Sequence, residues 1–358
     1  MNPDFLKVIA ASPADRRGLF LATANRIGTT IQNIEKDFWV TWVLDLLFNG
    51  KQPNEPRLLF KGGTSLSKAY GLISRFSEDI DITVFREDIG QQIESSDLTV
   101  LSGKQQRAKL ESVKKACQIY VQGPLRERLD RQIKEAFSKT QQTSPDSPVL
   151  IDPSDTDGQT LLFRYPSVVT ADSDYILPSV KIEAGAKSAL DPHRLVSILP
   201  YIAQDFPSSQ LRVDNVLTID AERTFWDKII IMHGLRRWHD QRGELRQQGQ
   251  RVSRHYYDLY KLSLSREGKK ALADNPLAEQ CAQHAMAFFN NTDLDLKSAR
   301  RGSFSIVPSI EMETLLRRDY QAMVGMVFGD VPNFSEVISA INALEKAINS
   351  PEAQPYKI

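Results

Sequence analysis

The sequence is poor in cysteine and in long apolar runs, and both shortages exclude classes of protein. Its two cysteines, Cys117 and Cys281, lie far apart with no CxxC or Cys/His cluster, which argues against a disulfide framework and against a zinc site. We expect both to be buried free thiols. No run approaches the roughly 18 apolar residues of a membrane helix, and the N-terminus lacks the basic start and apolar stretch of a signal peptide. The sequence therefore predicts a cytoplasmic protein with no membrane contact.

Net charge is also absent, because 45 Lys and Arg balance 45 Asp and Glu. The net charge thus gives no indication of nucleic-acid binding, and any basic surface must be local. The GxxxxGK[ST] signature of a P-loop is missing as well. What is present is a chain of 358 residues with 41% apolar and 25% charged residues, which is long enough for two globular domains.

The order of predicted elements indicates an α+β fold. We expect helices between residues 13 and 48, with Ser12 as an N-cap, and short strands at residues 57–60 and 79–84. A charged segment near residues 103–139 is predicted to be an inserted helical hairpin broken at Gly123-Pro124, followed by a polar loop and then by strands at 160–169 and 174–186. The predicted division is an N-terminal helical segment at 1–50, a catalytic core at 51–219 and a helical domain at 220–358.

Two aspartates alternate with isoleucines in the segment Ser77-Glu78-Asp79-Ile80-Asp81-Ile82. Successive side chains of a strand point to opposite faces, so Asp79 and Asp81 share one face while the isoleucines anchor the other. Two adjacent carboxylates repel each other unless a cation lies between them, and Mg²⁺ prefers such oxygen ligands. The alternative is a strand edge with solvated acids.

The glycine turn Gly62-Gly63-Thr64-Ser65 precedes this strand and lies between a predicted strand and a predicted helix. Backbone N–H groups at such a turn can bind phosphate, although an ordinary strand-to-helix turn has the same residues. In the later segment Val180-Lys181-Ile182-Glu183-Ala184-Gly185, Glu183 could add a third carboxylate from a neighbouring strand. It could equally form an exposed Lys–Glu pair with Lys181.

Two residues of the predicted helical domain are further candidates. Lys228 follows the helical spacing of apolar residues in ERTFWDKIIIMHG and could hold a triphosphate; otherwise it is a surface lysine or a partner of Asp227 or Glu222. Asp258 is embedded among aromatics in YYDLY, where a carboxylate needs a partner such as Lys228 or Arg254.

An arginine-rich segment is the candidate for binding an RNA backbone, since few acids interrupt it. A solvated helical hairpin is the alternative. Its arginines are Arg236, Arg237, Arg242, Arg246, Arg251 and Arg254.

The glycine turn, the DxD strand and a later strand acid, in this order, resemble the DNA polymerase β superfold of nucleotidyltransferases. The run KGGTSLSKAYGLISRFSEDIDI resembles the first motif of the AbiEii-type nucleotidyltransferase toxins, which occur in abortive-infection and type IV toxin–antitoxin systems and include the MenT toxins. Likeness to the family extends through IEKDFWVTWVLDLLF, KIEAGA, ERTFWDKIIIMHG and RHYYDLYKL, over residues 30 to 265.

The resemblance implies a polymerase-β-like core in which Asp79 and Asp81 hold Mg²⁺. It further implies that Gly63, Thr64, Ser65 and Lys228 contact phosphate and that Asp258 belongs to the active site. His255 departs from the family, because many relatives have an Asp at the position that follows Arg254.

The leading hypothesis is therefore an Mg²⁺-dependent nucleotidyltransferase toxin that moves NMP from an NTP to the 3′ end of tRNA and is neutralised by a cognate antitoxin. Glu183 would activate the acceptor hydroxyl. Two alternatives remain, namely a kinase-like or hydrolytic phosphoryl transferase and a catalytically silent protein that binds RNA or a partner on the same scaffold.

Overall fold

A computed structural model describes residues 2–141, 143, 146–169, 178–207, 210–246 and 251–350. The chain forms two compact units, and each is described by itself. The first unit contains the sheet together with the N-terminal helices, and the second is mainly helical. The first comprises Met1–Ala69, Phe76–Ile93 and Arg107–Thr218, and the second comprises Tyr70–Arg75, Glu94–Gln106 and Ile219–Ile358.

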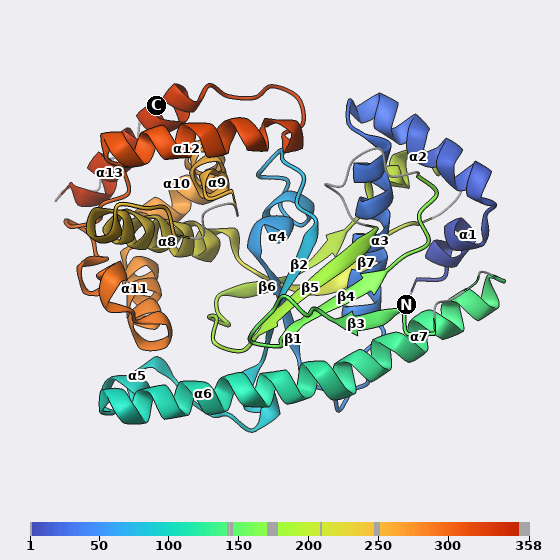
Figure 1. The fold of residues 1–358 in the computed structure, drawn as a ribbon, viewed down its shortest axis with the longest axis horizontal. Coiled ribbons are helices and arrows are strands. Elements are labelled where there is room, and N and C mark those ends of the chain that lie inside the picture. The colour runs from blue at the N-terminus through green and yellow to red at the C-terminus, as the bar shows by residue number, and fades with distance from the viewer. Residues whose placement is uncertain are drawn as a thin grey trace. The chain divides into compact units, whose positions relative to one another are not determined.

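A seven-stranded mixed sheet is the centre of the first unit (Figure 1). Its strand order is β3-β4-β5-β2-β1-β7-β6, in which β2 runs antiparallel to β1 and parallel to β5. The strands are β1 Leu58–Lys61, β2 Asp79–Val84, β3 Val149–Ile151, β4 Thr160–Arg164, β5 Ser179–Gly185, β6 His193–Ile198 and β7 Val213–Ile219.

The strand predicted at residues 79–84 is present with the same ends. Those predicted around 57–60, 160–169 and 174–186 are present with shifted ends, although residues 170–177 lie outside the described part. Strand β3 lies inside the segment predicted to be a loop, because Val149 and its neighbours pair with β4. Strands β6 and β7 were not predicted from the sequence. The mixed α+β class is as expected.

The helices at the start of the chain are α1 Asp4–Ala10, α2 Pro13–Ile27 and α3 Ile31–Phe48. The hydroxyl of Ser12 caps α2 by accepting the N–H of Asp15, as predicted. Helix α3 is buried along almost its whole length and packs on β2 and β5. Its Trp39 stacks on Tyr165 beside β4, at 5.4 Å between ring centroids, so the aromatic core holds helix and sheet together.

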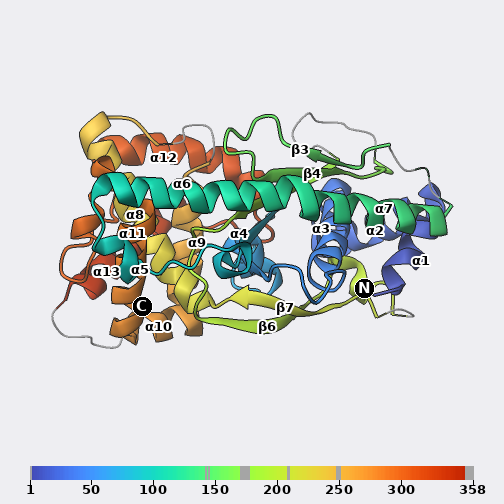
Figure 2. The same cartoon turned by 90° about the horizontal axis from the view of Figure 1, so that it is seen from below.

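The predicted hairpin at residues 103–139 is wrong, because this segment is one long helix (Figure 2). Helix α6 Gly103–Tyr120 continues through a π-helical turn, Val121–Leu125, into α7 Arg126–Lys139. Pro124 lies within the π-helical turn, whose wider hydrogen-bond spacing accommodates a residue without an N–H. The proline therefore marks a local change of helix type and not a reversal of the chain.

The first helix of the second unit is the short α5 Ser95–Thr99, and the C-terminal helices follow. In helix α8, Ala221–Arg242, Phe225, Ile229 and Met232 are fully buried, as the helical spacing predicted. Both cysteines of the chain are buried free thiols, also as predicted. No helix in the described residues is long and apolar enough to cross a membrane. The C-terminal helices are α8 Ala221–Arg242, α9 Ser253–Leu264, α10 Arg266–Ala273, α11 Asn275–Phe289, α12 Ile310–Met323 and α13 Phe334–Asn349.

Candidate active site

The two aspartates of the DxD segment lie on β2 beside Glu183 of β5. In the parallel register of these strands, Asp79 is opposite Lys181 and Asp81 is opposite Glu183. Directly opposed residues point to the same face of a sheet, so three carboxylates and one lysine share this face. Ile80 and Ile82 are fully buried on the other face. The alternation predicted from the sequence is confirmed, and the adjacent strand is the one that carries Glu183.

Gly62 follows β1 and lies directly against the carboxylate of Asp81. A Cβ atom added to this glycine would be 2.1 Å from Asp81 Oδ2, and its backbone has a φ of +80°. Both the left-handed conformation and the close approach exclude a side chain. The glycine of the motif is therefore explained by the position of Asp81.

Asp79 lies in a strongly negative environment. Its side chain is half-buried, and burial together with Glu78, Glu183 and Asp81 raises its pKa to about 7. Lys36 of α3 opposes this shift and forms an ion pair with Glu78, and Lys36 itself is almost fully buried. Like charges around a buried carboxylate are the electrostatic condition that a bound cation relieves.

These carboxylates fit a divalent cation by their chemistry, since hard oxygen ligands suit Mg²⁺. The fit is incomplete in this conformation, because Lys181 Nζ holds Glu183 Oε1 at 2.6 Å. Within the described ranges no three His, Cys, Asp or Glu side chains are gathered closely enough to hold a metal ion. Asp79 and Asp81 are thus the candidate ligands, and Glu183 would need to leave Lys181 to join them.

The hydroxyls of the glycine turn are used inside the protein. Helix α4, Gly62–Lys68, begins at the first glycine and has no side-chain cap. Thr64 Oγ1 donates to the backbone oxygen of Asp79, and Ser65 Oγ donates to the backbone oxygen of Gly62 at 2.9 Å. Both side chains are fully buried. Only backbone N–H groups of this turn are therefore suited to an anion, and Thr64 instead ties the turn to the start of β2.

Lys228 and Asp258 meet in the core of the second unit. Lys228 Nζ lies 2.8 Å from Asp258 Oδ2, so this expected pairing is present. The second partner is Arg75, which was not foreseen: its Nε and Nη2 donate to the two carboxylate oxygens at 2.7 and 2.8 Å. Asp227 pairs instead with Arg223, and Glu222 with Lys270.

Two cations on one buried carboxylate set its charge state. Burial alone would raise the pKa of Asp258, but Arg75 and then Lys228 outweigh it and hold this pKa well below its usual range. Burial lowers the pKa of Lys228. The neighbouring His255 is kept neutral, since burial and then Lys228 and Arg254 lower its pKa. The cluster therefore carries a surplus positive charge.

The arginine-rich segment is largely neutralised by acids that lie later in the chain. Arg236 pairs with Asp240, but Arg242 pairs with Asp293 at 2.6 Å and Arg237 with Asp295 at 3.5 Å. The guanidinium groups of Arg242 and Arg246 both lie over Trp238, and Arg251 contacts the sulfur of Met326. Arg254 is partly exposed, and its charge helps to lower the pKa of His255 and of Lys228.

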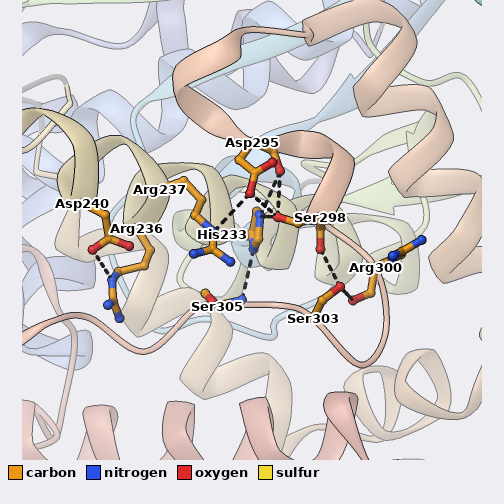
Figure 3. A network of polar contacts seen from close by, with 9 residues as sticks. All are labelled: His233, Arg236, Arg237, Asp240, Asp295, Ser298, Arg300, Ser303 and Ser305. Carbon is orange, nitrogen blue, oxygen red and sulfur yellow. Dashed lines mark hydrogen bonds and ion pairs between the residues drawn. The ribbon is translucent and has the colours of Figure 1, made fainter.

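Figure 3 shows how one of these acids is fixed. His233 Nδ1 accepts the N–H of Ser305 at 3.0 Å, so its other ring nitrogen carries the proton and faces Ser298 and the backbone oxygen of Asp295. Ser298 Oγ in turn donates to the Asp295 carboxylate that Arg237 reaches. This network holds Asp295 in place as a partner of the arginine segment.

A family model described as nucleotidyl transferase AbiEii toxin, type IV toxin–antitoxin system, matches residues 45–347. The chain belongs to this family. It is thus a nucleotidyltransferase toxin, and membership implies an NTP substrate and an antitoxin partner. Among solved structures it resembles MenT4, a nucleotidyltransferase toxin of Mycobacterium tuberculosis H37Rv, with a TM-score of 0.50 over 94% of this chain and 90% of that one. The two are 14% identical, so this likeness concerns the fold. No curated protein sequence matches the chain.

Proposed function

We propose that this toxin transfers NMP from an NTP to an RNA, at the 3′ end of tRNA, and that the reaction requires Mg²⁺. The observation that carries the proposal is the group of acids on β2 and β5, where burial and three neighbouring carboxylates raise the pKa of Asp79 to about 7. Such a site favours a cation that contacts phosphate oxygens. Magnesium bound there would offset the negative charge of the triphosphate.

Asp79 and Asp81 are the residues that would hold the metal. Gly62 keeps Asp81 in place because its lack of a Cβ leaves room for the carboxylate. The backbone N–H groups of Gly63, Thr64 and Ser65 would bind phosphate oxygens. Thr64 contributes indirectly, because its hydroxyl joins the turn to Asp79.

Glu183 is proposed as the base for the acceptor. The ribose hydroxyl oxygen forms a bond with the α-phosphorus, the bond between that phosphorus and the α,β-bridging oxygen breaks, and pyrophosphate leaves. The hydroxyl proton passes to the carboxylate of Glu183, which must first leave Lys181.

Lys228 is assigned to the triphosphate because of its charge and its motif. Asp258 orients it through the 2.8 Å ion pair, and Arg75 keeps Asp258 ionised through its bidentate contact. Arg75 is therefore a positioning residue, which acts on Lys228 through Asp258.

The test is a transfer assay with purified protein, Mg²⁺, total tRNA and each NTP in turn, labelled with ³²P at either the α or the γ position. Label from an α-labelled NTP should appear on tRNA, and Asp81→Ala should remove it while the protein stays folded by circular dichroism. Asp214→Ala is the matched control, because this acid lies on β7 of the same sheet and is half exposed. Label from γ-labelled NTP alone would indicate phosphoryl transfer, and no label from any NTP would contradict the proposal.

A further inference from the structure

Positive charge is concentrated on α6, although the charges of the whole chain balance. Helix α6 carries five Lys and Arg and a single acid, Glu111, whereas the whole chain has 45 of each sign. Lys104, Lys109 and Lys115 are exposed and form no ion pair within the described ranges. Lys114, by contrast, is partly buried and pairs with Asp157 at 2.7 Å. The positive charges of Lys104, Lys109 and Lys115 are thus not neutralised by an ion pair among the described residues.

The arginine-rich segment differs in this respect. Three of its arginines are paired with Asp240, Asp293 and Asp295, and a fourth lies with Arg242 over Trp238. A cation that already has a carboxylate partner must exchange that partner for a phosphate, which reduces the net gain. Lys104, Lys109 and Lys115 have no carboxylate partner of this kind among the described residues.

The buried residues of α6 lie in its second half and are Val113, Cys117 and Tyr120. Near the start of the helix, Gln106 Nε2 donates to the backbone oxygen of Ala287 at 2.8 Å. Lys104 and Lys115 are eleven residues apart, which is about three turns, so they share one face over roughly 16 Å. Lys109 projects from another side of the helix, about 120–140° around the axis from the other two lysines. A distance of roughly 16 Å is longer than one nucleotide step, so Lys104 and Lys115 can contact separate phosphates of one nucleic-acid backbone.

The exposed side of α6 is unsuited to the centre of a protein interface. Such centres are rich in aromatic residues and poor in lysine. Here the large exposed apolar residue is Ile119, at 62% exposure, and the exposed cations include three lysines. Lysines of this kind contact phosphates as point charges and read no base sequence.

We propose that α6 binds the phosphate backbone of the RNA acceptor through Lys104, Lys109 and Lys115. This inference rests on the proposed function in taking the acceptor to be RNA, and it places the RNA contact on α6 and not on the arginine-rich segment. The contact is electrostatic, so it should be independent of RNA sequence and sensitive to salt.

Binding of labelled total tRNA to the full chain tests this without any NTP. We expect the triple variant K104A/K109A/K115A to weaken binding about tenfold or more at 0.1 M salt and to lower the slope of log K against log salt by about 2–3. The KM for NTP should stay unchanged. The matched control is R131A/K134A/K139A, which removes the same charge from α7, where the exposed Glu127 and Glu135 alternate with the cations.

Several results would overturn the inference. One is an equal loss of binding in the two triple variants, which would mean that net charge alone matters. Another is unchanged tRNA binding in K104A/K109A/K115A, with or without loss of antitoxin binding. A larger loss in R236A/R242A would return the RNA contact to the arginine-rich segment. Failure of the proposed function looks different, because wild-type protein would then transfer no nucleotide to any RNA whatever the binding result.

Discussion

Two carboxylates of this toxin, one half-buried and one fully buried, have opposite electrostatic environments. Asp79 on β2 is surrounded by other acids, and burial and those acids raise its pKa to about 7. Asp258 on α9 is completely buried, but Arg75 and Lys228 hold its pKa well below the usual range. The first site has too much negative charge for its surroundings, and the second has one carboxylate for two cations.

The difference separates two tasks that a buried acid can perform. A carboxylate with fixed cationic partners is part of the folded core and positions those partners. A carboxylate that faces like charges lowers the stability of the fold and is retained where a ligand compensates for it. We therefore propose that Asp79 holds a metal ion and that Asp258 positions Lys228.

The largest expected effect comes from the matched pair Asp258→Asn and Asp79→Asn. Asp258→Asn leaves Arg75 and Lys228 without their counter-ion, and we expect it to lower the free energy of unfolding by about 3–5 kcal/mol. Asp79→Asn removes a repelled charge, so it should leave that free energy unchanged or raise it while abolishing nucleotide transfer. Urea unfolding monitored by circular dichroism measures both. A similar decrease in the free energy of unfolding of the two variants would contradict the proposal that the two carboxylates have different roles.

The pH dependence of stability should also differ in sign between the two sites. The folded-state pKa of Asp79 is raised from the ordinary aspartate value of 3.8 to about 7. Its contribution to stability is fully present below about 3.8 and is lost as pH rises towards 7. Asp258 has a lowered pKa, so its contribution is present above its unfolded-state pKa and is lost in acid. Unfolding of wild type and Asp79→Asn from pH 4 to 8 should show the two curves diverging with pH, and parallel curves would contradict the assignment.

A smaller effect is expected from Gly62→Ala compared with Gly71→Ala. Both glycines have positive φ, at +80° and +62°, so each substitution costs about 1–2 kcal/mol of backbone strain. At Gly62 the new Cβ also meets Asp81 at 2.1 Å, whereas at Gly71 it meets nothing within 4 Å. Transfer activity should fall at least tenfold in Gly62→Ala and stay near wild type in Gly71→Ala. Equal activities would mean that the position of Asp81 is not critical.

The smallest expected effect concerns Lys181→Met. This change removes the ammonium group whose Nζ lies 2.6 Å from Glu183 Oε1. The Lys181 side chain is 35% exposed, so the free energy of unfolding should change by less than about 1 kcal/mol. We expect the Mg²⁺ concentration for half-maximal transfer to decrease, because Glu183 becomes available beside Asp79 and Asp81. Metal titrations of the transfer rate would show this, and an increase in that concentration would argue that Lys181 assists the metal site.

The sequence predicted the parts of the site that depend on local periodicity. Alternation in Asp79-Ile80-Asp81-Ile82 determined which side chains share a face, and helical spacing around Lys228 placed the buried residues of α8. The sequence alone left open whether Glu183 lies beside Asp81, because the order of strands in a sheet depends on contacts between residues distant in sequence. The helix break at Gly123-Pro124 was predicted wrongly because a π-helical turn can retain a proline.

Residues missed by the sequence analysis are those whose partners lie far along the chain. Arg75 is 183 positions from Asp258, and no local pattern links them. The sequence offered one indication of a role for Arg75, which is a basic residue just before the acidic segment that contains Asp79 and Asp81. Asp293 and Asp295 were missed for the same reason, so the arginine-rich segment looked less neutralised than it is.

The most direct test of the account is binding of Mn²⁺, as a spectroscopic substitute for Mg²⁺, to the protein in the presence of a non-hydrolysable NTP analogue. Electron paramagnetic resonance would count the bound ions in wild type, Asp79→Asn, Asp81→Asn and the control Asp214→Asn. We expect both β2 variants to lose this binding and Asp214→Asn to retain it. Undiminished Mn²⁺ binding in Asp79→Asn and Asp81→Asn would contradict the claim that these two carboxylates hold the metal.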